Sequence, residues 1–146
     1  MLAYRICKEE YSTELKASGR INRWNKEGEF VIYAAESRAL CALELLAHTN
    51  GVTPQGNYKV MVIDISEPTI EEVSMDALPS NWKSIKSYPA LQRIGSHWYH
   101  KQSSLILKVP SVLVAQEYNY VINVKHSHFN QLKIAALETF FWDERL

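Results

Sequence analysis

Three residue types within the stretch 22–48 could together do chemistry on one ligand. Arg23 precedes a tryptophan, Tyr33 falls in a short apolar segment, and Glu44 falls in a segment with helical spacing. A guanidinium can bind phosphate oxygens through two parallel hydrogen bonds, and a tyrosine ring offers a flat face to a heterocycle. A carboxylate can accept a hydrogen bond from a sugar hydroxyl and stabilise positive charge that grows on the sugar. Together they would suit a ligand that contains a phosphate, an aromatic ring and a sugar.

The same three residues also have an ordinary structural explanation. Arg23 could pair with Glu27 on the surface, Tyr33 could pack in the core of a strand, and Glu44 could be a solvated helix residue. The spacing of these residues leaves both interpretations open.

A turn, a strand and a helix must position these side chains. A turn is expected at Gly28, and a strand over residues 30–34. The helix is expected from apolar residues at i, i+3, i+4 and i+7, which predict one buried face with Glu44 off its centre. These residues are Ala39, Ala42, Leu43 and Leu46. A strand packed beside the helix that follows it could bring Arg23, Tyr33 and Glu44 to one cleft.

The rest of the chain is mostly extended. Strands are expected over residues 1–7, 58–65, 69–74, 104–109, 111–115, 118–124 and 132–142. A second helix is expected from Pro89 to Gln102, because proline is tolerated in the first helical turn. Segment 8–18 has weak helical character, and connection 66–88 is a candidate for a mobile or partner-facing insert. The pattern predicts an α+β fold with a mixed, mostly antiparallel sheet and a few helices.

Length and composition bound the class of protein. A chain of 146 residues suggests one domain over 1–146. The net charge of zero makes a broad nucleic-acid-binding surface unexpected and gives little protection against self-association. No apolar run is long enough to span a membrane and no signal peptide is visible, so cytoplasm is the expected compartment. Cys7 and Cys41 lie in apolar patterns and are expected to be buried, unpaired thiols.

Several other chemistries lack their sequence signatures. Neither a GxGxxG nor a GxxxxGK[ST] motif is present. Two histidine pairs, His97 with His100 and His126 with His128, have no cysteine partner and no HExxH context, so no metal site is expected. Ser111 lacks the GxSxG context of a hydrolase nucleophile.

The run GRINRWNKEGEFVIYAAESRALCALE, residues 19–44, resembles the opening signature of RES-domain proteins. Further matches follow in order over nearly the whole chain. They are Leu78-Pro79 with Trp82, residues 94–98, residues 107–111, Asn119-Tyr120, Asn123, His126 and residues 141–146. One departure is visible, because this chain has Asn123-Val124-Lys125-His126 where the family usually reads Asn-Pro before its histidine.

The resemblance implies a toxin of a bacterial type II toxin–antitoxin pair, with a fold similar to ADP-ribosyltransferases, that consumes NAD⁺ as a substrate without a separate cofactor or metal. It places the family's arginine, glutamate and serine on Arg23, Glu44 and Ser111, and its tyrosine on Tyr33. Glu44 would hold a ribose hydroxyl, and Arg23 would grip the pyrophosphate or orient the nicotinamide-side ribose. Tyr33 would stack on the nicotinamide ring, and Ser111 would bind the ligand or fix Glu44.

The implied partner is an Xre-type helix-turn-helix antitoxin whose C-terminal segment covers the active-site entrance. The chain itself is not expected to bind nucleic acid or membrane, and a homodimer within a toxin–antitoxin complex is left open. The resemblance does not fix the acceptor, which is water, phosphate or a protein. An inactive binding module is the alternative from a different class.

Overall fold

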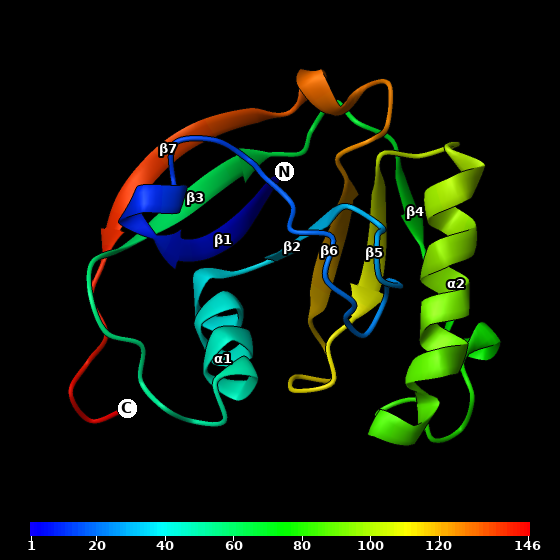
Figure 1. Ribbon diagram of the computed structural model, residues 1–146, viewed down its shortest axis with the longest axis horizontal. Coiled ribbons are helices and arrows are strands. Elements are labelled where there is room, and N and C mark those ends of the chain that lie inside the picture. The colour runs from blue at the N-terminus through cyan, green and yellow to red at the C-terminus, as the bar shows by residue number, and fades with distance from the viewer.

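A seven-stranded sheet forms the framework of the protein, whose computed structural model describes all residues 1–146 (Figure 1). The strands are β1 (Leu2–Lys8), β2 (Val31–Ala35), β3 (Tyr58–Asp64), β4 (Ile70–Glu72), β5 (Ile106–Pro110), β6 (Tyr118–Asn123) and β7 (Lys133–Phe140). Their order in the sheet is β4-β5-β6-β2-β1-β3-β7. Only β4 and β5 pair in parallel, so the predicted mixed, mostly antiparallel α+β fold is confirmed.

Two helices complete the fold, α1 (Arg38–His48) and α2 (Tyr88–Lys101). Helix α1 follows β2 directly, and its N-cap is Ser37, whose side chain accepts a hydrogen bond from the Leu40 N–H. Helix α2 is the crossover that joins the parallel strands β4 and β5. It begins within a residue of the predicted start and carries its proline in the first turn. Neither helix combines the length and apolar character that crossing a membrane requires.

Both helices pack on the same face of the sheet. On β2, Tyr33 lies opposite Val121 of β6, and Ala35 lies opposite both Asn119 of β6 and Tyr4 of β1. Directly opposed residues share a face, so this register places all five side chains on one side. The apolar residues of that face pack against α2 around β5 and β6, and against α1 around β1 and β3. Figure 1 shows the two helices apart from each other, with β5 and β6 between them.

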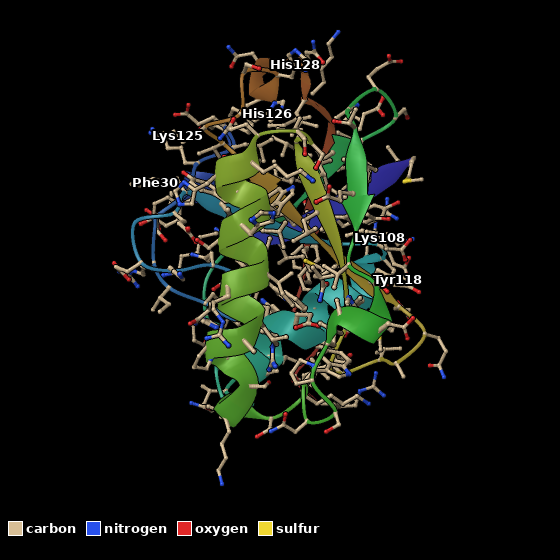
Figure 2. All side chains as sticks on the ribbon, turned by 90° about the vertical axis from the view of Figure 1, so that its right-hand side faces the viewer. Phe30, Lys108, Tyr118, Lys125, His126 and His128 are labelled. Atoms are coloured by element: carbon tan, nitrogen blue, oxygen red, sulfur yellow. The ribbon has the colours of Figure 1, made fainter.

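The other face of the sheet is covered by connecting segments. Its core includes Ile32, Ile63 and Ile122, with Leu15 and Phe129 from the connections packed against it. On this face, the ammonium of Lys108 on β5 lies 4.2 Å from the ring centroid of Tyr118 on β6 (Figure 2).

The predicted buried stripe of α1 is wrong for two of its four residues, because Ala42 packs against β1 and β3 as expected and Leu46 is half-buried. Ala39 and Leu43 are exposed, whereas Leu40 is buried and Cys41 and Leu45 pack against β1 and β3. The apolar residues of this segment allow two overlapping buried faces. The face that packs on the sheet is centred about one residue further along the helix than the predicted face. Glu44 follows Leu40 by one helical turn and therefore lies on the inward side of α1 rather than off it.

Three predictions about connecting segments also need correction. Residues 111–115 form bends and a turn instead of a strand, and residues 8–18 form only a short 3₁₀ turn, Glu9–Tyr11. The connection 66–88 is not a loose insert, because it contains β4 and buries Val73 and Trp82 in the core under α2. It therefore belongs to the packed body of the protein.

Candidate active site

Glu44 projects from α1 onto the sheet, where two side chains hold it. Its Oε1 accepts hydrogen bonds from the Ser111 hydroxyl at 2.9 Å and from the Asn119 amide at 2.9 Å. Its Oε2 makes no hydrogen bond within the protein, and the residue is half-buried. Glu44 is thus not a solvated helix residue. Its carboxylate is held on the sheet through Oε1 alone.

Ser111 owes its position to the turn that follows β5. Its Oγ accepts hydrogen bonds from the N–H groups of Leu113 at 3.1 Å and Val114 at 3.2 Å, while its own proton goes to Glu44. Such side-chain bonds to nearby backbone compete with strand pairing, which explains why the chain turns here. Ser111 is only 1% exposed. The structure therefore places it behind Glu44, as a residue that orients the carboxylate.

Tyr33 fixes the loop that carries Arg23. Its hydroxyl donates to Asn25 Oδ1 at 2.6 Å and accepts from the Trp24 N–H at 3.2 Å. Burial raises the pKa of Tyr33 well above its usual value, with a further rise from Tyr88, so the phenol remains protonated in the physiological pH range. The hydroxyl is committed to the loop, and the ring is half-buried and packs against the core beneath α2.

The backbone next to Arg23 packs closely against α2, whereas its side chain makes few contacts. The Trp24 carbonyl beside it packs so closely on α2 that a β-carbon on Gly95 would lie 1.6 Å from its oxygen. The guanidinium carbon lies 4.6 Å from the Tyr88 ring centroid, and Nη1 donates weakly to the Lys83 carbonyl at 3.5 Å. The alternative pairing with Glu27 does not form, because the carboxylate of that residue accepts from the Ile21 N–H.

The structure forms two pairs from the four predicted residues and sets both pairs on one sheet face. Arg23 and Tyr33 are joined through the loop at Trp24, and Glu44 is joined directly to Ser111. No hydrogen bond or ion pair links the pairs. They meet across β2 and β6, where Tyr33 and Asn119 are diagonal neighbours, a relation that places side chains about 7–8 Å apart.

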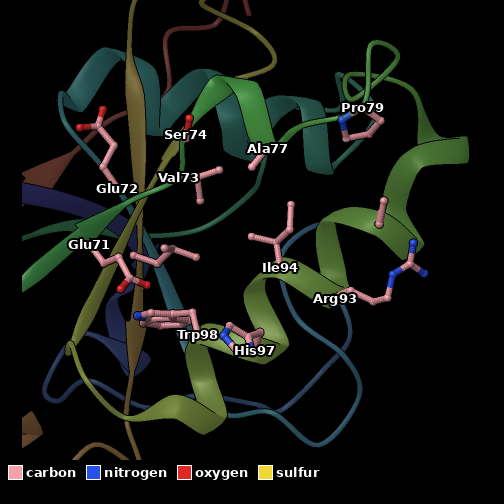
Figure 3. A pocket seen from close by; sticks show the side chains of 12 residues that line it. Glu71, Glu72, Val73, Ser74, Ala77, Pro79, Arg93, Ile94, His97 and Trp98 are labelled. Atoms are coloured by element: carbon pink, nitrogen blue, oxygen red, sulfur yellow. The ribbon is translucent and has the colours of Figure 1, made fainter.

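Two cavities lie elsewhere, and none of the four predicted residues lines them. One, of about 520 Å³, opens between β4 and α2 and is lined by Val73, Ile94 and Trp98, with Glu71 and His97 beside them (Figure 3). The other lies beside the C-terminal segment, at Tyr58 and Trp142.

The histidine pairs make contacts within the protein. His100 lies 3.0 Å from the carboxylate of Glu29. His126 Nε2 lies 2.9 Å from the Gln102 carbonyl, and its Nδ1 accepts from the His128 N–H. Figure 2 places His126 and His128 at the far end of β6 from Tyr118.

Two residues of the site were not among the predicted site residues. The Asn119 amide donates to the same Glu44 oxygen as the Ser111 hydroxyl. Asn25 is buried and accepts the hydrogen bond from the Tyr33 hydroxyl, which holds that side chain against the loop. The Asn25 amide also donates to the Arg20 and Lys26 carbonyls. Both asparagines stand within the motifs that carry the family resemblance, which is the one sequence signal that they share.

Comparisons with known proteins agree over nearly the whole chain. A family model of the RES domain matches residues 2–143. A protein named Toxin Res from Yersinia enterocolitica is 32% identical over 152 residues, covering 100% of this chain and 99% of that protein. A protein named Prs ADP-ribosylating toxin from Sphingobium is 33% identical over 127 residues, covering 85% of this chain and 79% of that protein.

A solved structure shares the fold. It is the crystal structure of the MbcT–MbcA toxin–antitoxin complex of M. tuberculosis, in which one chain superposes with a TM-score of 0.77 at 17% identity. The match covers 95% of this chain and 83% of that chain. The expected ADP-ribosyltransferase-like fold is thereby confirmed.

Proposed function

This chain belongs to the RES-domain family, and we propose that it is an NAD⁺-consuming toxin of a toxin–antitoxin pair that cleaves the bond between nicotinamide and ribose. The observation that carries the proposal is Glu44, whose Oε1 is held by two donors while Oε2 stays free. A carboxylate held this way suits a developing positive charge on a sugar.

The reaction needs little acid catalysis. The pyridinium nitrogen of NAD⁺ is already cationic, so the bond from the ribose C1′ breaks with both electrons going to nitrogen. Nicotinamide then leaves neutral, and positive charge remains on the ribose as an oxocarbenium-like centre. The Oε2 of Glu44 accepts a hydrogen bond from a ribose hydroxyl and stabilises this charge.

The other residues bind and orient the dinucleotide. Arg23 lies on a loop fixed by Tyr33 and places its guanidinium on the pyrophosphate, while the Tyr33 ring stacks on nicotinamide. Ser111 acts through Glu44 and not by contact with the ligand, because it is buried and its proton is committed. Positioning and fixed charge then provide most of the acceleration.

Nicotinamide release by the purified chain, freed of any antitoxin, tests the proposal. The products also identify the acceptor at C1′: water gives ADP-ribose, and phosphate gives ADP-ribose phosphate with turnover that depends on phosphate. If NAD⁺ binds in calorimetry but is never turned over under any of these conditions, the chain is a binding module instead.

Mono-ADP-ribosylation of a specific protein is the second candidate. It is favoured by the relative from Sphingobium, whose name describes an ADP-ribosylating toxin. Incubation of a cell extract with NAD⁺ labelled in its adenylate part separates the two candidates. Label transferred to one protein band supports modification, whereas label found only in small molecules supports hydrolysis or phosphorolysis.

The proposed partner is an Xre-type antitoxin that covers this sheet face. Leu43 and Leu113 are 43% and 42% exposed, and each lies within two residues of Glu44 or Ser111. Exposed leucines beside a polar site suit an apolar segment of a partner. Co-expression with the neighbouring open reading frame should yield a complex that releases no nicotinamide. Leu43→Asp should weaken that complex and restore turnover.

A further inference from the structure

Glu29 is a buried carboxylate that the proposed reaction does not use. Its side chain is 6% exposed and lies between the Arg23 loop and α2. Its Oε1 accepts from the Lys26 N–H at 2.7 Å, and its Oε2 accepts from the Ser96 hydroxyl at 2.6 Å. His100 Nε2 lies 3.0 Å from the same Oε2. A buried carboxylate is stable only when such donors satisfy it.

These contacts join two parts of the chain that are far apart in sequence. Lys26 belongs to the loop that presents Arg23, whereas Ser96 and His100 belong to the last two turns of α2. Further bonds run in parallel: the Gln92 amide donates to the Asn22 carbonyl, and the Phe30 N–H donates to the Tyr99 hydroxyl. Figure 2 shows the loop, in blue, beside this helix.

We infer that Glu29 is a positioning residue for substrate binding, which locks the loop of Arg23 onto α2 and thereby sets where the guanidinium meets the pyrophosphate. The inference rests on the proposed function in its choice of ligand. The anchoring itself rests only on the contacts of Glu29. Arg23 needs this support because its own side chain has no carboxylate partner, only the Tyr88 ring and one weak bond.

Glu29→Gln is the informative substitution, because it keeps the size of the side chain and replaces one acceptor oxygen by a donor. The amide oxygen can still accept from the Lys26 N–H, but the amide nitrogen can only donate toward Ser96 and His100, so the charge-assisted attachment to α2 is weakened. Ser96→Ala removes one donor without touching the loop and guards against a variant that fails to fold. Glu10→Gln is the matched control, since Glu10 is exposed and its side chain forms no hydrogen bond or ion pair.

Two readouts decide the inference. Hydrogen exchange in residues 19–29 should become faster in Glu29→Gln and Ser96→Ala, while exchange in β3 stays unchanged. In calorimetry, the Kd of ADP-ribose, which contains the pyrophosphate, should rise about tenfold or more in the two variants. The Kd of nicotinamide should stay unchanged. Equal weakening of both ligands would mean a general loss of structure and would overturn the positioning role.

The two proposals fail in different ways. Unchanged exchange in the loop would overturn the anchoring, whether or not NAD⁺ is a substrate. Faster exchange with unchanged ADP-ribose affinity would overturn the link to substrate binding. If the wild-type protein has no turnover of NAD⁺, the proposed function fails, while the exchange experiment still decides what Glu29 does.

Discussion

Replacing Ser111 by alanine should slow turnover without weakening the binding of NAD⁺. The substitution removes one of the two donors that hold Glu44, and it leaves the backbone N–H groups of Leu113 and Val114 without their acceptor. Because Ser111 is buried behind the carboxylate, it makes no contact that substrate affinity would report.

The size of the effect follows from the bond that is lost. A hydrogen bond to a charged group contributes about 1.5–3 kcal/mol, and each 1.36 kcal/mol changes a rate tenfold. If that bond acts fully in the transition state, kcat falls about 10- to 150-fold. The cost in unfolding free energy should be about 1–3 kcal/mol, because the N–H groups of Leu113 and Val114 lose an acceptor that is itself buried.

Steady-state nicotinamide release, with urea unfolding alongside, measures both effects. Ser127→Ala is the matched control, because Ser127 is exposed and makes no hydrogen bond. A raised KM at unchanged kcat would show that the Ser111 hydroxyl binds the ligand instead. If neither constant changes, the assigned role in orienting Glu44 is wrong.

Three further predictions test the scaffold. Gly95→Ala should lower the unfolding free energy in urea by about 1–3 kcal/mol, because its β-carbon would meet the Trp24 carbonyl; Gly51→Ala, in open space at positive φ, should cost only about 1 kcal/mol. Tyr33→Phe keeps the ring but removes two loop contacts, so urea unfolding should show a loss of about 1–3 kcal/mol; an unchanged midpoint would argue against its anchoring role. Burial raises the pKa of Cys41 from 9.0 to about 11, so its alkylation by iodoacetamide at pH 8 should be far slower in the folded protein than in urea. Because the folded pKa is the higher one, the stability contributed by this thiol should be lost as the pH rises from 9 to 11.

The strands were predictable where Val, Ile and aromatic residues gather in short runs. β3 and β6 lie within two residues of their expected bounds, because each contains such a run, at residues 60–63 and 120–122. The parallel pairing of β4 with β5 was not predictable, since β4 has three residues and its partner is supplied only after the crossover through α2.

The sequence named four members of the candidate site, but not Asn25, Asn119 or the hydrogen bonds that connect the residues. The motif identified Arg23, Tyr33, Glu44 and Ser111, yet no spacing in the sequence predicted that Ser111 would bond to Glu44 across 67 positions. The inward direction of Glu44 depended on which of two apolar stripes packs on the sheet, and that is decided by β1 and β3. Long-range packing of this kind leaves no local signal.

The Glu44→Gln variant tests the central claim most directly, because it keeps the shape of the side chain and removes the charge. The account predicts that the wild-type chain and the control Glu10→Gln both release nicotinamide from NAD⁺. Release by Glu44→Gln should be slower by about 10²-fold or more, with unfolding in urea little changed. Turnover by Glu44→Gln at the wild-type rate would contradict the account.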